Sequence, residues 1–311
     1  METPSAKMAA MAARIGSEEQ VCSARRVQVM DGRGRGARLI YAANGALNFV
    51  LSESNALDIL RLWHRGTNIG FVSKNGLYTG DADFPGAFPA GMLYTCGLDA
   101  IGGVAGHPVH GRLHSIPAEI RELRADASGI RIVGEIRDTA LFGRNLAMTR
   151  TIETAANSGE IRIVDRVENR AFREEKYCLL YHVNAGWPLV DAGAEISGDF
   201  AESHPRTPWA EREMATMLKV EPPVDNMEET CYFHLVRDGR MALENRALGK
   251  RLAVASDLRR FVEWKRRASG DYVIGLEPCT SWLDDRLEYR TLAPGASAEH
   301  RLSICVEDIA P

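Results

Sequence analysis

The chain has 311 residues, of which 45% are hydrophobic and 26% are charged, and its formal net charge is −4 with a pI near 6.1. This balance is typical of a water-soluble globular protein, and it gives no overall attraction to nucleic acid or to an anionic membrane. A chain of this length is sufficient for one large all-β domain or for two ordinary domains.

The cysteines indicate a reducing compartment. Six single cysteines are spread over the chain without a CxxC pair, and a chain this long does not need a disulfide framework. The first twenty residues lack the apolar core of a signal peptide, and no run of about 18 apolar residues is present to span a bilayer. We therefore expect a cytoplasmic protein with reduced thiols, and neither a membrane nor a nucleic acid as its partner.

The N-terminal part of the chain predicts a short extension followed by turns and strands. We expect residues 1–13 to form a flexible extension and residues 14–311 to form a single domain. The sequence DGRGRG at Asp31–Gly36 predicts a turn, because its glycines do not have the GxGxxG spacing of a nucleotide-binding loop. Leu47–Ser52 alternates like a strand, whereas Ala56–Trp63 fits helical and strand patterns about equally, with a slight preference for a strand.

From residue 120 onward, short strand-like segments alternate with turn residues. Three pairs of segments flank a connection that contains glycine, which predicts three hairpins: Ile120–Ala125 with Ile130–Arg137, Met148–Thr154 with Ile161–Val167, and Cys231–Val236 with Met241–Leu243. Three further segments complete the set of strands: Phe261–Trp264, Tyr272–Leu276 and Leu302–Val306. No long amphipathic helix and no repeat of fixed period is evident. This pattern predicts an all-β fold, a large antiparallel β-sandwich.

The segment His110–Glu119, HGRLHSIPAE, is rich in titratable side chains and contains residues that disfavour a helix. In an extended chain, the side chains of His110, Arg112 and His114 project from one face. Because arginine is rarely buried without a partner, we expect this face to form the floor of a polar pocket. The alternative for each histidine is a structural role at the edge of a sheet.

Two later segments carry residues suited to sugar chemistry. In YHVNAGWP, His182 and Asn184 share one face of a strand, and Trp187 adds an aromatic surface. Hydrogen-bonding groups suit the hydroxyls of a sugar and an aromatic ring suits its C–H face, although a core Trp187 and a structural His182 are the alternative. In GLEPCT, Glu277 ends a strand just before a proline, where a carboxylate can face either a pocket or the surface.

In this order, HGRLHSIPAE, YHVNAGWP and GLEPCT resemble motifs of the aldose 1-epimerase (galactose mutarotase-like) superfamily, and more closely of its bacterial branch DUF4432. The segments YTCG at 94–97 and NALDI at 55–59 are also similar to that branch, and the resemblance extends over residues 14–306. It implies a single β-supersandwich and a mutarotase that needs no cofactor. In that mechanism a carboxylate takes the proton of the anomeric hydroxyl and an imidazolium protonates the ring oxygen, so that the sugar ring opens and then closes on the other face.

By motif position, the resemblance implies Glu277 as the base and His182 as the acid, while His110 binds the sugar and stabilises its ring oxygen. Environment can tune glutamate and histidine toward the pKa values that acid–base catalysis at neutral pH requires. The other expected contacts of the sugar come from several segments: Arg112, Asn184, Trp187, Asn48, Asp58 and Glu229.

This chain departs from the branch at two places. Asn55 stands where the branch usually has an arginine, so one presumed anchor of the substrate is neutral. The acidic ligand for sugar hydroxyls has three candidates that the sequence does not rank, namely Asp225, Glu228 and Glu229.

Two other functions fit the same residues. His110, His114, His182 and Glu277 are possible nitrogen and oxygen ligands of a divalent metal, as in a metal-assisted sugar isomerase or epimerase. A carbohydrate-binding protein without catalysis is the second alternative, because a fold does not by itself imply an activity. In each case we expect a small-molecule sugar as the partner, and the sequence leaves a homodimer open.

Overall fold

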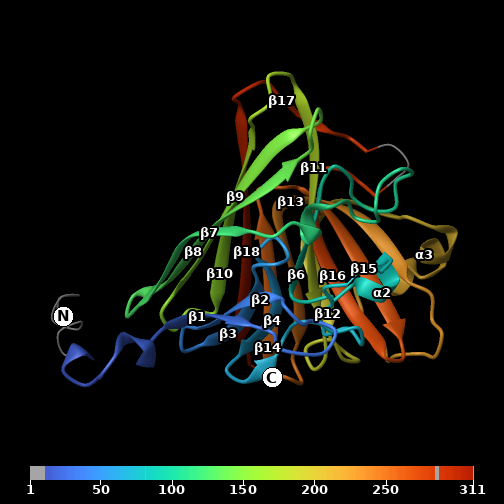
Figure 1. Cartoon of the computed structure of the whole chain (residues 1–311). Coiled ribbons are helices and arrows are strands. Elements are labelled where there is room, and N and C mark those ends of the chain that lie inside the picture. The colour runs from blue at the N-terminus through green and yellow to red at the C-terminus, as the bar shows by residue number, and fades with distance from the viewer. Residues whose placement is uncertain (1–10, 81, 284–286, 311) are drawn as a thin grey trace.

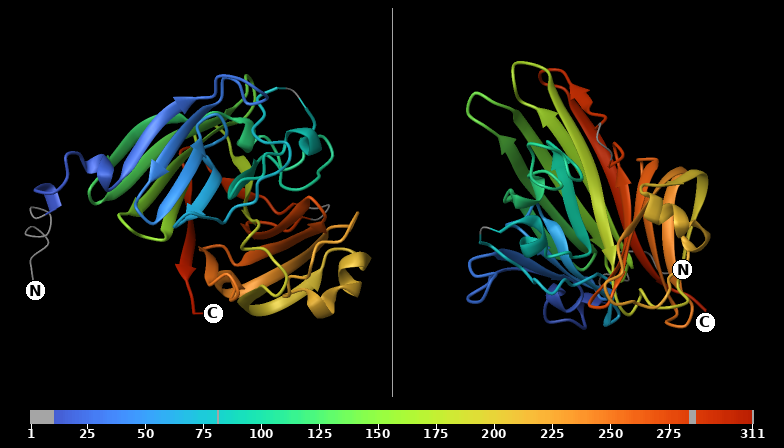
Figure 2. Two further views of the ribbon diagram at one scale, coloured as in Figure 1. Left: turned by 90° about the horizontal axis from the view of Figure 1, so that it is seen from below. Right: turned by 90° about the vertical axis from the view of Figure 1, so that its right-hand side faces the viewer.

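The computed structural model describes residues 11–80, 82–283 and 287–310, and most of these residues belong to antiparallel strands (Figure 1). The strands form two sheets, one of five strands and one of thirteen. Figure 2 shows the N-terminal strands, in blue, lying across the green strands of the larger sheet, which continues into the orange C-terminal strands. The prediction of a large antiparallel β-sandwich is therefore confirmed.

The smaller sheet comes from the N-terminal part of the chain and has the order β1-β2-β3-β4-β5. Its strands are β1 (Ser23–Gln28), β2 (Arg38–Ala43), β3 (Leu47–Ser52), β4 (Asp58–His64) and β5 (Thr67–Asn68). The predicted strand at 47–52 is confirmed as β3, and the ambiguous segment at 56–63 enters the strand β4. The segment Asp31–Gly36 forms the predicted turn.

The larger sheet has the order β17-β11-β16-β15-β13-β14-β18-β10-β9-β8-β7, with β6 paired to β11 and β12 paired to β13. Its first strands along the chain are β6 (Leu93–Leu98), β7 (Glu119–Asp126), β8 (Gly129–Thr139), β9 (Asn145–Ala155), β10 (Glu160–Asn169), β11 (Glu175–Ala185) and β12 (Glu195–Pro205). The remaining strands are β13 (Thr230–Asn245), β14 (Lys250–Ser256), β15 (Arg260–Ala268), β16 (Asp271–Cys279), β17 (Arg290–Leu292) and β18 (Ser297–Asp308).

Two of the three predicted hairpins are confirmed, as β7–β8 and β9–β10, and the third is wrong. The segments on either side of Asp238 and Gly239 form one strand of 16 residues, β13. Its first half pairs with β15 and its second half with β14, while β12 follows its other edge with two register shifts. Gly239, with φ +67°, bends the strand beside this irregularity, so the chain changes its partner without reversing its direction.

The helices of the described residues are short. They are η1 (Glu18–Gln20), α2 (Phe84–Ala87), η2 (Leu113–Ser115), α3 (Pro208–Arg212) and η3 (Met214–Thr216). Within the described ranges, none of them has the length and apolarity that crossing a membrane requires. Of the extension expected at residues 1–13, residues 1–10 lie outside the described part of the chain. All six cysteines are free thiols, as predicted.

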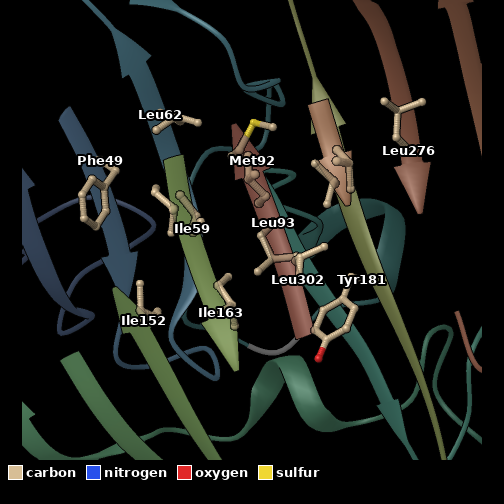
Figure 3. Packing of buried hydrophobic residues seen from close by; sticks show 14 of the residues in the cluster. Phe49, Ile59, Leu62, Met92, Leu93, Ile152, Ile163, Tyr181, Leu276 and Leu302 are labelled. Atoms are coloured by element: carbon tan, nitrogen blue, oxygen red, sulfur yellow. The ribbon is translucent and has the colours of Figure 1, made fainter. Parts of the chain in front are cut away.

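The main hydrophobic core lies between the two sheets (Figure 3). Phe49, Ile59 and Leu62 of the smaller sheet pack toward Ile152 and Ile163 of the larger sheet. Each of these side chains is at most 1% exposed. Burying one such side chain contributes about 1.5–3 kcal/mol, so this contact holds the smaller sheet on the larger one.

A buried polar cluster also joins the two sheets. The guanidinium of Arg150 on β9 donates to both carboxylate oxygens of Asp165 on β10, at 2.9 and 2.7 Å, and to Asp58 Oδ1 on β4, at 2.9 Å. Thr95 of β6 donates its backbone N–H and its hydroxyl to Asp58, and Tyr181 of β11 donates its hydroxyl to Asp165. Burial raises the pKa of Asp58 to about 6, against the lowering effect of Arg150. Five strands of both sheets thus meet in one hydrogen-bonded cluster around Arg150.

The opposite face of the larger sheet carries a second, smaller hydrophobic cluster. Along β11, Tyr181 and Val183 point into the main core, whereas Leu180 belongs to the second cluster. Because side chains alternate along a strand, His182 projects from the same face as Leu180. The candidate site is built on this face.

Candidate active site

His182 and Glu277 lie on neighbouring strands of the larger sheet. The register that pairs Val183 with Leu276 sets His182 of β11 directly opposite Glu277 of β16. Residues that stand opposite each other in an antiparallel pair have their Cβ atoms about 4.5–5.5 Å apart, close enough for the side chains to interact. Two motifs that are far apart in the sequence therefore meet across one pair of strands.

The two side chains form the centre of the site. His182 Nδ1 lies 3.2 Å from Glu277 Oε1, and the side chains are 5% and 1% exposed. This contact lacks the geometry of a hydrogen bond, and neither Glu277 oxygen nor His182 Nδ1 has a hydrogen-bond partner among the described residues. Because buried polar atoms nearly always have a partner, these atoms indicate a site that a ligand completes.

Burial disfavours the charged form of both groups. It raises the pKa of Glu277 well above its ordinary value, with a further increase from Glu229 and a smaller opposing effect of Arg206. It lowers the pKa of His182 to about 4. Both shifts favour the arrangement in which a proton shared by the pair rests on Glu277, and the 3.2 Å contact gives that proton a short path to His182.

His110 approaches this pair from the loop between β6 and β7. Its ring centroid lies 5.5 Å from that of His182, with the two rings nearly perpendicular. The backbone N–H of Gly102 donates to His110 Nδ1 at 3.3 Å, so Nε2 carries the proton of the neutral ring. Burial lowers the pKa of His110 well below its ordinary value, and His182 and His114 add to this effect. At neutral pH His110 is thus an uncharged hydrogen-bond donor beside the pair.

The prediction that His110, Arg112 and His114 share one extended face is wrong. His110 takes a left-handed conformation with φ +65°, and the 3-10 helix η2 begins shortly after it, so the three side chains diverge. Arg112 forms an ion pair with Asp99 at 3.0 Å and lines a neighbouring, larger cavity. His114 stacks on Tyr94, with ring centroids 4.5 Å apart, and lines that larger cavity as well. Of the three, only His110 belongs to the site of the acid–base pair.

An aromatic wall comes from β15. Trp264 pairs with Gly275 of β16, and its ring centroid lies 5.1 Å from that of His182 at an interplanar angle of 79°. The indole Nε1 of Trp264 donates to Glu229 Oε2 at 2.8 Å. The structure therefore brings Glu229 to the site. Trp264, and not Trp187 as we expected, supplies the aromatic surface beside His182.

Three further residues of the site carry no sequence motif. Phe84 of α2 packs against His110, and Phe88 packs against His182, with ring centroids 5.1 and 5.8 Å apart. Arg206 follows directly after β12 and lines the same space. These residues come from segments far from the recognised motifs, and a single phenylalanine or arginine has no local pattern that distinguishes it from core or surface.

These side chains enclose a cavity of about 250 Å³. Its lining residues are Phe84, Phe88, Gly102, Gly103, Val109, His110, His182, Arg206, Glu229, Cys231, Trp264, Glu277 and Leu283. Cavities for drug-sized ligands measure roughly 300–1,000 Å³, so this one suits a single small polar molecule. The larger cavity, of about 580 Å³, shares Phe84, Phe88 and Val109 with it but contains no acid–base pair.

Trp187 and Asn184 do not line the cavity. Trp187 is 66% exposed, because the chain has already left β11 at Ala185. Asn184 is fully buried and donates its side-chain amide to the backbone carbonyls of Gly91 and His182, at 3.1 and 3.0 Å. Its side chain also offsets part of the lowering of the His182 pKa by burial. Asn184 therefore supports His182 and does not face the space for a ligand.

Asn48 and Asp58 also lie elsewhere. Asn48 is exposed on β3 of the smaller sheet, where it pairs with Ala43 and Trp63 beside a shallow surface depression. Both oxygens of Asp58 accept hydrogen bonds within the buried polar cluster. The expectation that these two residues contact the sugar is therefore wrong for a substrate in the cavity of His182 and Glu277.

The four residues considered as metal ligands do not converge. His110, His182 and Glu277 line the smaller cavity, whereas His114 lines the larger one. In the part of the chain that the structure describes, no group of three or more His, Cys, Asp or Glu side chains has an arrangement that could hold a metal ion. The four side chains therefore do not form one metal site together, because His114 lies apart from the other three.

The fold is similar to that of solved bacterial proteins. A structure described as a "putative aldose 1-epimerase" from Klebsiella pneumoniae subsp. pneumoniae matches with a TM-score of 0.83 and 21% identity, over 94% of this chain and 87% of that chain. A galactose mutarotase-like protein from Clostridium acetobutylicum matches with a TM-score of 0.72 and 12% identity, over 93% of this chain and 100% of that chain. These similarities show a galactose mutarotase-like fold.

Sequence comparison places the chain in a family. No curated protein is significantly similar to it in sequence. The family model described as "Domain of unknown function (DUF4432)" matches residues 34–306, a range that contains every lining residue of the smaller cavity. The chain therefore belongs to the DUF4432 family.

Proposed function

We propose that the protein is a mutarotase of the aldose 1-epimerase type, which interconverts the anomers of a sugar. The observation that carries this proposal is the buried pair of His182 and Glu277, whose facing atoms lie 3.2 Å apart and have no hydrogen-bond partner among the described residues. A protein that only binds sugars gains nothing from burying an unpartnered carboxyl group, which costs free energy. Transfer of a proton between two sugar oxygens needs such a pair.

The mechanism follows from the single proton that the pair holds. When the anomeric hydroxyl of the sugar donates a hydrogen bond to Glu277, the carboxylate form is favoured and the proton of Glu277 passes to His182. Glu277 then takes the hydroxyl proton, the bond between C1 and the ring oxygen breaks, and His182 protonates the ring oxygen. Rotation about C1–C2 and the reverse steps close the ring on the other face of the aldehyde, which restores both groups.

The surrounding residues assist these steps. His110, a neutral donor through Nε2, is suited to hold the ring oxygen as it gains charge. Trp264 offers an aromatic face for the C–H groups of the ring, and Phe84 and Phe88 exclude water from the pair.

Gly275 determines where the Glu277 carboxyl group lies. A Cβ added to Gly275 would lie 2.3 Å from Glu277 Oε1 and 3.2 Å from Trp264 Cβ, and the backbone of Gly275 is not left-handed, so alanine keeps the strand conformation but displaces the carboxyl group. We expect Gly275→Ala to lower enzymatic anomer exchange about 100-fold with only a small decrease in melting temperature. In the Glu277→Gln variant, Gly275→Ala should cause no further loss of exchange activity. If the double variant instead loses activity by the product of the two single losses, Gly275 acts independently of Glu277.

The pH dependence of exchange distinguishes this pair from an ordinary one. With its pKa lowered to about 4, His182 does not titrate near pH 6.5 as a free histidine does, and the raised pKa of Glu277 lets that carboxyl group keep its proton to a higher pH than a free glutamate. We expect kcat/KM, corrected for spontaneous mutarotation, to persist above the ordinary pKa of glutamate, about 4.3, and to fall with rising pH as Glu277 loses its proton. A decline whose midpoint coincides with the titration of His182 would contradict the proposal.

The decisive experiment is anomer-exchange NMR of the purified protein with a panel of aldoses and ketoses. The proposal predicts faster exchange between α and β signals of at least one sugar and no new sugar among the products. If exchange is not accelerated for any sugar, the protein is not a mutarotase. A new sugar product, formed by a protein that loses its activity on chelation, would support the metal-assisted isomerase instead.

A further inference from the structure

The rim of the cavity carries two opposite charges that do not neutralise each other. Arg206 and Glu229 both line the cavity, and both are exposed. Glu229 is held by the indole N–H of Trp264 at 2.8 Å. The Arg206 side chain lies beside Cys231 at the cavity wall, and within the described ranges no carboxylate forms an ion pair with it.

The backbone on both sides of Arg206 is fixed. Pro205 ends the ladder between β12 and β13, and the Arg206 N–H donates to the carbonyl of Cys231 at 2.9 Å. Thr207 caps the helix α3, which begins at Pro208. Two prolines and two hydrogen-bonded elements thus limit the motion of the chain, so the guanidinium is presented at the rim with little loss of backbone entropy on binding.

The charge of Arg206 also acts on the acid–base site. After the dominant effect of burial, its positive charge contributes to the lowering of the His110 pKa and opposes the raising of the Glu277 pKa. Because Arg206 and Glu277 line the same cavity, one ligand can meet both side chains. Among the described lining residues Arg206 is the one cation that is charged at neutral pH, because His110 and His182 are neutral there.

We infer that the substrate is a sugar with an anionic oxygen substituent, a carboxylate or a phosphate, which Arg206 binds at the rim while the anomeric carbon lies between His182 and Glu277. The planar guanidinium matches two oxygens of either group. Glu229, already positioned by Trp264, accepts hydroxyls of the same sugar. This inference relies on the proposed mutarotase function for the position of the anomeric carbon, whereas binding of the anion does not depend on it.

The test compares matched sugars on variants of one position. Binding is titrated by calorimetry, and exchange is followed by NMR, for glucose, glucuronate and glucose 6-phosphate and for the corresponding galactose series. We expect the wild type to prefer one anionic form, and we expect Arg206→Met to reduce the preference over the neutral sugar by about 10–100-fold. Arg206→Lys should retain part of it. Arg212→Met, on the adjacent α3 and outside the cavity, should leave it unchanged.

Two further results check the sign of the effect. Glu229→Gln removes a negative charge from the same rim, so it should increase the preference for the anion. Added salt should decrease the preference, because Arg206 is exposed to solvent. Equal binding of anionic and neutral sugars by the wild type, or an unchanged preference in Arg206→Met, would overturn the inference. If neutral sugars exchange their anomers and the protein shows no preference for anionic sugars, the mutarotase proposal stands and only the inference about the anion fails. If anionic sugars bind through Arg206 but no sugar exchanges its anomers, only the mutarotase proposal fails.

Discussion

Replacement of Glu277 by glutamine is expected to slow enzymatic anomer exchange by about 10²–10⁴-fold, the usual contribution of general acid–base catalysis. Glutamine keeps the shape of the side chain, but it neither takes the hydroxyl proton nor passes one to His182 across the 3.2 Å contact. The measurement is the rate of α–β exchange by NMR with the spontaneous rate subtracted. Glu288→Gln, at an exposed residue outside the cavity, is the control and should retain full activity.

The same Glu277→Gln variant should be more stable than the wild type at neutral and alkaline pH. A carboxyl group whose pKa is raised by folding favours the folded state at low pH, and this contribution is lost as the pH rises toward the folded-state value. Glutamine has no charge to bury, so its melting temperature should exceed that of the wild type by more at pH 8 than at pH 5. A variant that loses both activity and stability would show that Glu277 is a structural residue.

Most strands of this fold were predictable because their signals act over a few residues. The turn at 126–129 joins β7 and β8, and the alternation at 47–52 forms β3, without help from distant parts of the chain. The strand β13 was mistaken for a hairpin because its continuity depends on β12, which begins 35 residues before it along the chain and pairs with both of its halves. Turn residues such as Asp238 and Gly239 are compatible with a bend as well as with a reversal.

The candidate site was predictable only where a motif and a strand coincide. His182 and Glu277 were found because each lies in a recognisable segment and on one face of a strand. Trp264 was missed because its place beside His182 depends on the register of β15 on β16 and of β16 on β11. The segment after His110 was misjudged because a left-handed histidine is rare and has no sequence signature.

Replacement of Arg150 by methionine is expected to destabilise the protein by about 3–5 kcal/mol, because it leaves two carboxylates buried without their cation. Arg150 is fully buried and binds Asp165 and Asp58, which belong to different sheets. Tyr181, which donates to Asp165, directly precedes His182, so a loosened cluster should also disturb the active site. Urea unfolding monitored by tryptophan fluorescence measures the loss.

The pH dependence of this loss identifies its cause. Without Arg150, burial raises the pKa of Asp58 with less opposition, so the carboxyl group is neutral at low pH and carries an uncompensated charge at high pH. The destabilisation should therefore be smaller at pH 5 than at pH 8. Arg25→Met, which removes an exposed ion pair with Glu19, should leave the unfolding midpoint unchanged at both pH values. A loss for Arg150→Met that is the same at both pH values would assign the effect to packing of the long side chain, and the buried charges would then contribute little.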